Sequence, residues 1–140
     1  MAANVDPIFS IAPQIGEAHL AAANTGADLS TNAALVFTGA TNGSLLQEVR
    51  IKPVPATATV ATVARLWINN NGTLSTITNN TMIDDLTIPA IAASQVAGII
   101  APFFTLPRGG LFVPSTYRVY VTIGTYSTGT FTITGIGSNY

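Results

Sequence analysis

The sequence lacks cysteine and has little charge and little histidine. No residue of the 140 is Cys, so disulfides and thiol chemistry are excluded. His19 is the single histidine, and one His cannot form a multi-histidine metal site. Charged residues make up 8% of the chain, against about 25% in typical soluble domains. The few cations are scattered and form no basic stripe, so we expect no binding to nucleic acid.

Recognisable catalytic motifs are also missing. The sequence contains no GxSxG, HExxH, P-loop or GxGxxG pattern. Asp84 and Asp85 are neighbours on a predicted strand and therefore point to opposite faces, so they cannot act as the paired carboxylates of a glycosidase. We expect one of them to accept a backbone hydrogen bond; the alternative is a calcium site with Asn79 and Asn80. The sequence thus predicts a protein that is not an enzyme and needs no cofactor or metal.

Targeting and membrane signals are weak. Residues 1–14 have no basic region followed by an apolar core, so we expect no secretory signal. The most apolar run, residues 88–104, is interrupted by two prolines and polar residues, and we expect no membrane span. Three Asn-x-Ser/Thr sequences, at Asn42, Asn71 and Asn79, are attributed to chance in a chain so rich in Asn and Thr.

The residues that are abundant favour β-structure. Thr, Val and Ile suit a pleated surface, and short runs of them are separated by turn residues. This pattern predicts one all-β domain over residues 1–140, an antiparallel two-sheet sandwich of jelly-roll type with about eight strands. Residues 1–13 are expected to form an extended N-terminal arm, with Val5, Ile8, Phe9 and Ile11 as contacts to a neighbouring subunit or to the domain itself.

Alternation of apolar and polar residues predicts which side chains face the core. In residues 44–54, Leu45, Val49 and Ile51 are expected to point inward. Asn42-Gly43, just before this run, is typical of a type I′ hairpin turn. The remaining inward residues predicted in this way are Leu66, Ile68, Met82, Leu86, Ile88, Tyr117, Val119, Val121, Ile123, Phe131 and Ile133.

The stretch RLWINN, residues 65–70, raises a separate question about its outward face. Arg65 and Trp67 share the side of the strand opposite to Leu66. Asn71-Gly72 at the end of the run indicates a turn. We expect the face of Arg65 and Trp67 to be covered by a neighbouring subunit, with cover by the chain's own arm as the alternative.

Residues 101–115, APFFTLPRGGLFVPS, form an unusually apolar stretch with three prolines. One interpretation makes it an oligomer contact through Arg108, Leu111 and Phe112. The other makes it two short strands joined by a glycine turn. The two are compatible, because the outer face of a hairpin can be the contact.

The C-terminal half resembles a group of known proteins. The resemblance rests on four segments, RLWINN (residues 65–70), MIDDLTIPA (82–90), FTLPRGGLFVPSTYRVYVTIGT (104–125) and the final GIGSNY. In this order they resemble small virion structural proteins of tailed bacteriophages, above all head decoration (cement) proteins. The resemblance covers about residues 60–140 and implies a β-rich, jelly-roll-like subunit, often trimeric, that contacts the major capsid protein on the outer surface of the head.

From these observations we expect a structural virion protein that stabilises the capsid. A tail, baseplate or fibre subunit is the first alternative, since such proteins share similar sandwiches. A carbohydrate-binding module is the second. It would use Trp67, Tyr117 or Tyr120 to stack a sugar and Asn70 and Asn71 to hydrogen-bond it.

Overall fold

The computed structural model describes residues 11–26, 28–54, 58–94, 96, 98, 101–126 and 130–140. These residues form eight strands and one short 3₁₀ turn. The elements are β1 (Ala12–Leu20), β2 (Ala34–Thr38), β3 (Ser44–Pro53), β4 (Thr62–Asn69), η1 (Ile77–Asn79), β5 (Asn80–Ile88), β6 (Leu111–Val113), β7 (Arg118–Ile123) and β8 (Phe131–Asn139). No helix in this part of the chain is long and apolar enough to cross a membrane.

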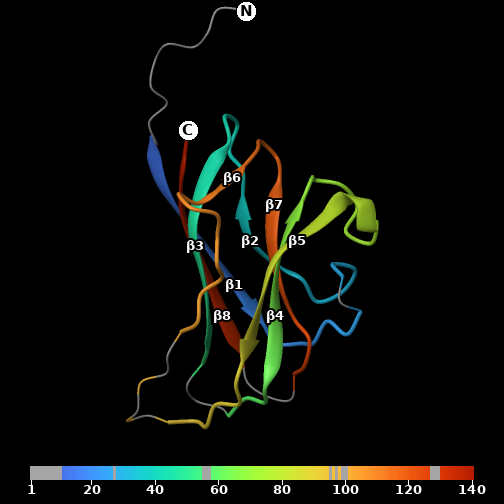
Figure 1. The fold of residues 1–140 in the computed structure, drawn as a ribbon, viewed down its shortest axis with the longest axis vertical. Coiled ribbons are helices and arrows are strands. Elements are labelled where there is room, and N and C mark those ends of the chain that lie inside the picture. Colours follow the sequence, from blue (N-terminus) through green and yellow to red (C-terminus); the bar gives the residue numbers. More distant parts are fainter. Residues whose placement is uncertain are drawn as a thin grey trace, which may run out of the picture.

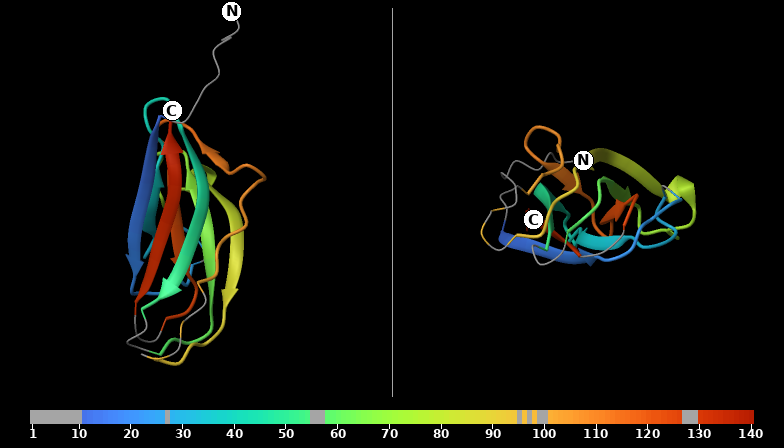
Figure 2. Two further views of the ribbon diagram at one scale, coloured as in Figure 1. Left: turned by 90° about the vertical axis from the view of Figure 1, so that its left-hand side faces the viewer. Right: turned by 90° about the horizontal axis from the view of Figure 1, so that it is seen from below.

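The strands form two four-stranded antiparallel sheets that face each other (Figures 1 and 2). The strand order is β1-β8-β3-β6 in the first sheet and β2-β7-β4-β5 in the second. The strand pairs are nested, because β4 pairs with β5, β3 with β6, β2 with β7 and β1 with β8. The prediction of an all-β, antiparallel two-sheet sandwich is confirmed.

The core lies between the two sheets and follows the predicted alternation over most of its length. Val49 and Ile51 of β3 meet Val121 and Ile123 of β7 in one buried cluster, and none of the four is exposed to solvent. Ile133 of β8 is equally buried. Such β-branched residues pack well on a pleated surface, which explains why this Val- and Ile-rich chain folds as a sandwich.

Two inward predictions were wrong, and a β-bulge explains each. The register of β3 against β8 shifts between Leu46 and Glu48, so Leu46 is buried and Leu45 is only half-buried. The register of β5 against β4 shifts beside Leu66 and Trp67, and this shift leaves Met82 exposed. A bulge adds one residue to one strand, so alternation counted across it assigns the wrong face.

The Asn42-Gly43 turn is present but is not a hairpin. The Gly43 N–H donates to Ala40 O at 2.9 Å, which makes Thr41 and Asn42 the central residues of the turn, and neither has a positive φ. A type I′ turn requires positive φ at both central residues. The turn carries the chain from β2 in the second sheet to β3 in the first, so the strands it joins are not paired.

One side of the sandwich is closed by a close approach of β1 and β2. A Cβ added at Gly16 of β1 would lie 1.7 Å from the carbonyl oxygen of Val36 in β2. Glycine is therefore required at this position. Gln14 adds a side-chain hydrogen bond to Thr38 O at 3.4 Å across the same gap.

The predicted N-terminal arm is only partly within the described residues. Val5, Ile8 and Phe9 lie outside them. Ile11 donates its backbone N–H to Asn139 O at 2.7 Å, and β1 begins at the next residue. The predicted boundary at residue 13 is thus too late, because residues 12 and 13 already pair with β8. Figure 1 shows the start of β1 and the C-terminus at the same end of the sandwich.

Candidate interaction face

Trp67 lies on the outer face of the second sheet and is covered by the chain's own loops. It packs against Leu29 of the β1–β2 connection, with Leu74 of the β4–β5 connection beside them, and only 8% of it is exposed. The β1–β2 connection is held by the buried Asn24, whose backbone N–H donates to Ile123 O at 2.7 Å and whose side chain donates to Asp28 O at 2.8 Å. The expectation that a neighbouring subunit or the arm covers Trp67 was wrong for this residue.

Burial of the aromatic residues also removes the predicted sugar platform. Tyr120 packs beside Trp67 and is 6% exposed, and Tyr117 packs against the main core. A stacking sugar needs an open aromatic face. The Asn70 side chain accepts the Gly72 N–H at 3.0 Å and so serves the turn. These residues therefore do not form the predicted carbohydrate site.

Arg65, the neighbour of Trp67 on this face, is half-buried. Its cross-strand partner on β5 is Asp85. The Nη1 atom is buried and has no hydrogen-bond partner among the described residues. Arg65 therefore belongs to the covered part of the second sheet rather than to an open contact surface.

The two adjacent aspartates serve different purposes, as the strand geometry predicts. Asp84 Oδ2 accepts the backbone N–H of Thr105 at 2.7 Å, whereas Asp85 is exposed. The Asn79 and Asn80 side chains donate to loop carbonyls, at 3.2 Å for Thr73 O and 2.7 Å for Leu74 O. The predicted backbone role of one Asp is confirmed. Within the described ranges, no three His, Asp or Glu side chains are grouped so as to bind a metal ion.

On the outer face of the first sheet, two exposed apolar side chains are direct cross-strand neighbours. Ile15 of β1 and Ile136 of β8 are cross-strand partners, and they are 67% and 38% exposed. Ile11 is exposed next to them, and Phe112 of β6 is 54% exposed in the same sheet. We call these four residues the apolar zone. Neighbouring exposed apolar residues are typical of interaction surfaces.

The residues of the predicted contact stretch around β6 differ in their exposure. Phe112 is cross-strand partner of Leu45 and its ring lies 6.2 Å from that of Tyr140, so it belongs to the exposed face. Leu111 packs against the core and is only partly exposed. Arg108 is exposed in a turn closed by a hydrogen bond from Gly110 N to Pro107 O at 2.8 Å. The predicted glycine turn is therefore present, but of the two strands expected beside it only β6 forms, and residues 101–107 make only an isolated bridge at Phe103.

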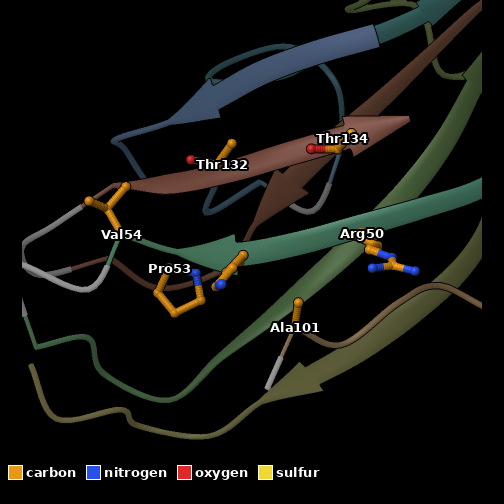
Figure 3. Close-up of a pocket in the computed structure, with 7 residues that line it drawn as sticks. Arg50, Pro53, Val54, Ala101, Thr132 and Thr134 are labelled. Atoms are coloured by element: carbon orange, nitrogen blue, oxygen red, sulfur yellow. The ribbon is translucent and has the colours of Figure 1, made fainter. Parts of the chain in front are cut away.

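The other end of the same face contains a pocket (Figure 3). Its volume is about 470 Å³, which is in the range of small ligand sites. It is lined by Arg50, Lys52, Pro53, Val54, Ala101, Thr132 and Thr134. Figure 3 shows the labelled residues of β3 and its continuation beside the threonines of β8, with Ala101 approaching from a separate segment. The pocket thus combines an apolar wall with two cations and two hydroxyls.

The two cations of the pocket differ in their partners. Arg50 Nη2 donates to Glu48 Oε2 at 3.2 Å, and Arg50 Nε forms an ion pair with the same carboxylate. These hydrogen bonds and the negative charge of Glu48 raise the pKa of Arg50, so Arg50 stays charged and is neutralised locally. Lys52 has no hydrogen-bond or ion-pair partner among the residues described, so its charge remains available to a ligand.

Ile11 and Phe112 of the apolar zone were predicted as contacts, whereas Ile15, Ile136 and the pocket were not, and of these only the two isoleucines leave a signal in the sequence. Ile15 alternates with Glu17 and His19, and Ile136 alternates with Thr132 and Thr134. Each isoleucine therefore stands on the polar side of its strand. The pocket has no comparable signal, because residues 50–54, 101 and 132–134 meet only in the folded chain.

Comparison of the chain with protein-family models, with curated proteins and with solved structures finds no match.

Proposed function

We propose that the protein is a structural component of a virion, a decoration or cement protein that oligomerises on the head and contacts the major capsid protein. The observation that carries the proposal is the apolar zone. Its Ile15–Ile136 pair is exposed on an open sheet face, where a flat partner surface can bury it. The resemblance of residues 60–140 to such proteins supports the same function.

The strand order supports the proposed fold type. We infer a jelly roll, because nested antiparallel pairs divided between two sheets are what a rolled-up hairpin produces. Many capsid-associated domains use this architecture, but it also occurs in proteins with other functions. The fold is therefore compatible with the proposed function but is not by itself evidence for it.

The mechanism is mechanical. A subunit that bridges neighbouring capsid proteins stabilises their junction by the apolar area it buries, about 25 cal/mol per Å². The low charge of the chain, 8% of residues, reduces the repulsion between closely spaced copies. A trimer places three such faces around one capsid axis and multiplies the contacts through avidity.

The test is binding of the purified chain to expanded capsids, followed by cryo-electron microscopy of the particles. Ile136→Asp places a charge in the apolar zone and is expected to abolish binding. Met82→Asp is the matched control, because Met82 is an exposed apolar residue of the other sheet. Circular dichroism and thermal unfolding establish that both variants are folded.

Three results would contradict the proposal. One is equal binding by the two variants, and another is the absence of capsid binding together with a monomeric state at high concentration. Density on the tail, baseplate or a fibre would favour the first alternative function instead.

A further inference from the structure

The pocket on the first sheet has the properties of a peptide site. Its wall is formed by Pro53, Val54 and Ala101, and the Thr132 and Thr134 hydroxyls stand at its β8 side. Lys52 is the charge in it that no described carboxylate neutralises. An apolar wall with a few polar groups is the usual composition of a ligand site. The matching ligand is a short apolar segment with one carboxylate.

Such a segment occurs in the chain itself. Residues 5–9 read VDPIF, and Asp6 is the only charged side chain of residues 1–10. Val5, Ile8 and Phe9 supply apolar groups around it. Pro7 lacks a backbone N–H and has a restricted φ, so less conformational entropy is lost when the segment binds. Charge and hydrophobicity of the segment are thus complementary to the pocket.

The position of β1 prevents Asp6 from reaching the pocket of its own subunit. The pocket threonines are cross-strand partners of Glu17 and His19, six and eight residues beyond Ile11. At about 3.4 Å per residue, the pocket lies roughly 20–27 Å along the sheet from Ile11. Asp6 precedes Ile11 by five residues, which span at most about 18 Å. Moreover, β1 runs toward the pocket, so its preceding residues would first have to reverse direction in a turn of about four residues.

We propose that the pocket binds residues 5–9 of a second copy of the chain, with the Asp6 carboxylate at the Lys52 ammonium and the apolar residues against Pro53, Val54 and Ala101. This inference rests on the proposed oligomerisation and specifies the contact between the subunits. The contact is heterologous, because a segment of one copy enters a pocket of the next copy. Three copies joined in this way close into a ring. The apolar zone at the other end of the face stays free for the capsid.

Disulfide trapping tests the exchange directly, because the chain contains no cysteine. The Val5→Cys protein, which keeps the Asp6 carboxylate, is mixed with the Thr132→Cys protein and oxidised. We expect a cross-linked dimer to form at least about tenfold faster than with Thr87→Cys, since a docked segment has a high effective concentration. Thr87 is an exposed residue of β5 in the other sheet. Equal rates would overturn the proposal. So would an intrachain disulfide in the diluted Val5→Cys/Thr132→Cys double variant, which would show docking within one subunit.

A charge exchange tests the chemistry of the contact. Asp6→Lys and Lys52→Asp each place like charges together, and we expect each to weaken self-association about tenfold in sedimentation experiments. The double variant is expected to recover the association of the unmodified chain. Arg118→Asp, at an exposed cation of β7 in the other sheet, is the control and is expected to change little. Failure of the double variant to recover would contradict the Asp6–Lys52 contact.

Capsid binding separates this inference from the proposed function. Cross-linking without capsid binding would overturn only the virion function. Capsid binding without cross-linking would overturn only the exchange of the N-terminal segment.

Discussion

Trp67 Nε1 donates a hydrogen bond to Thr122 Oγ1 at 3.1 Å, between adjacent strands on the outer face of the second sheet. Both residues are buried, although they lie on the side of the sheet that faces away from the core. The β1–β2 connection makes this possible, because Leu29 covers the indole. The tryptophan is thus a structural residue of a second, smaller apolar cluster.

Thr122→Val is expected to destabilise the protein by about 1–3 kcal/mol. The substitution keeps the side-chain volume but leaves the indole N–H buried without an acceptor. Thr122→Ser retains the hydroxyl and is expected to lose less stability. Urea unfolding followed by Trp67 fluorescence measures both variants. A loss for Ser as large as that for Val would show that the hydrogen bond is not the cause.

Gly16→Ala is expected to lower the free energy of unfolding by about 1–3 kcal/mol, because its Cβ would collide with Val36 O and force β1 away from β2. Gly98→Ala is the control, since no atom of the described residues beyond its chain neighbours lies within 4 Å of the added Cβ. Thermal unfolding compares the two. If both variants melt alike, the closure of the sandwich at this side does not depend on Gly16.

Asp84→Ala is expected to cost about 1–2 kcal/mol, whereas Asp85→Ala is expected to be nearly neutral. Only Asp84 accepts the Thr105 N–H, and a hydrogen bond to a charged group contributes more than a neutral one. Chemical denaturation of the two alanine variants, which differ by one position in the sequence, gives the comparison. Equal losses would contradict separate roles for the two carboxylates.

The β1–β2 connection is expected to weaken in acid. The Ser30 hydroxyl donates to Asp28 Oδ1 at 2.7 Å and the Ser30 N–H at 2.9 Å, which lowers the pKa of Asp28 below its usual 3.8. A lowered folded-state pKa means that this stabilisation is complete above the unfolded pKa and is lost as the pH falls through the folded one.

This pH dependence is measured as the free energy of unfolding between pH 6 and pH 2, about two units on either side of the usual pKa. Asp28→Asn is expected to flatten the acid part of the profile, and Ser30→Ala to shift it toward higher pH. An Asp28→Asn profile with the slope of the unmodified chain would rule out this carboxylate as the cause.

The sequence predicted which residues lie in the core only where the alternation along a strand continued without interruption. From Val119 to Ile123 and from Phe131 to Ile133, a single regular strand places every second residue in the core, and these predictions were confirmed. Leu45 and Met82 were assigned wrongly, because a bulge depends on the partner strand and leaves no mark in the local pattern.

The sequence by itself determined the fold class. Its Thr, Val and Ile content, its turn residues and its lack of helix-favouring charged residues are all local properties, and they agree on an antiparallel sandwich. The tertiary structure alone decided which outward faces are covered. Trp67 is buried because Leu29, 38 positions earlier, lies on it, whereas Ile15 and Ile136 have no such cover. Lys52 and Thr132, 80 positions apart, share a pocket only because β3 and β8 pair. Cover and cavities depend on long-range packing, which a local pattern does not encode.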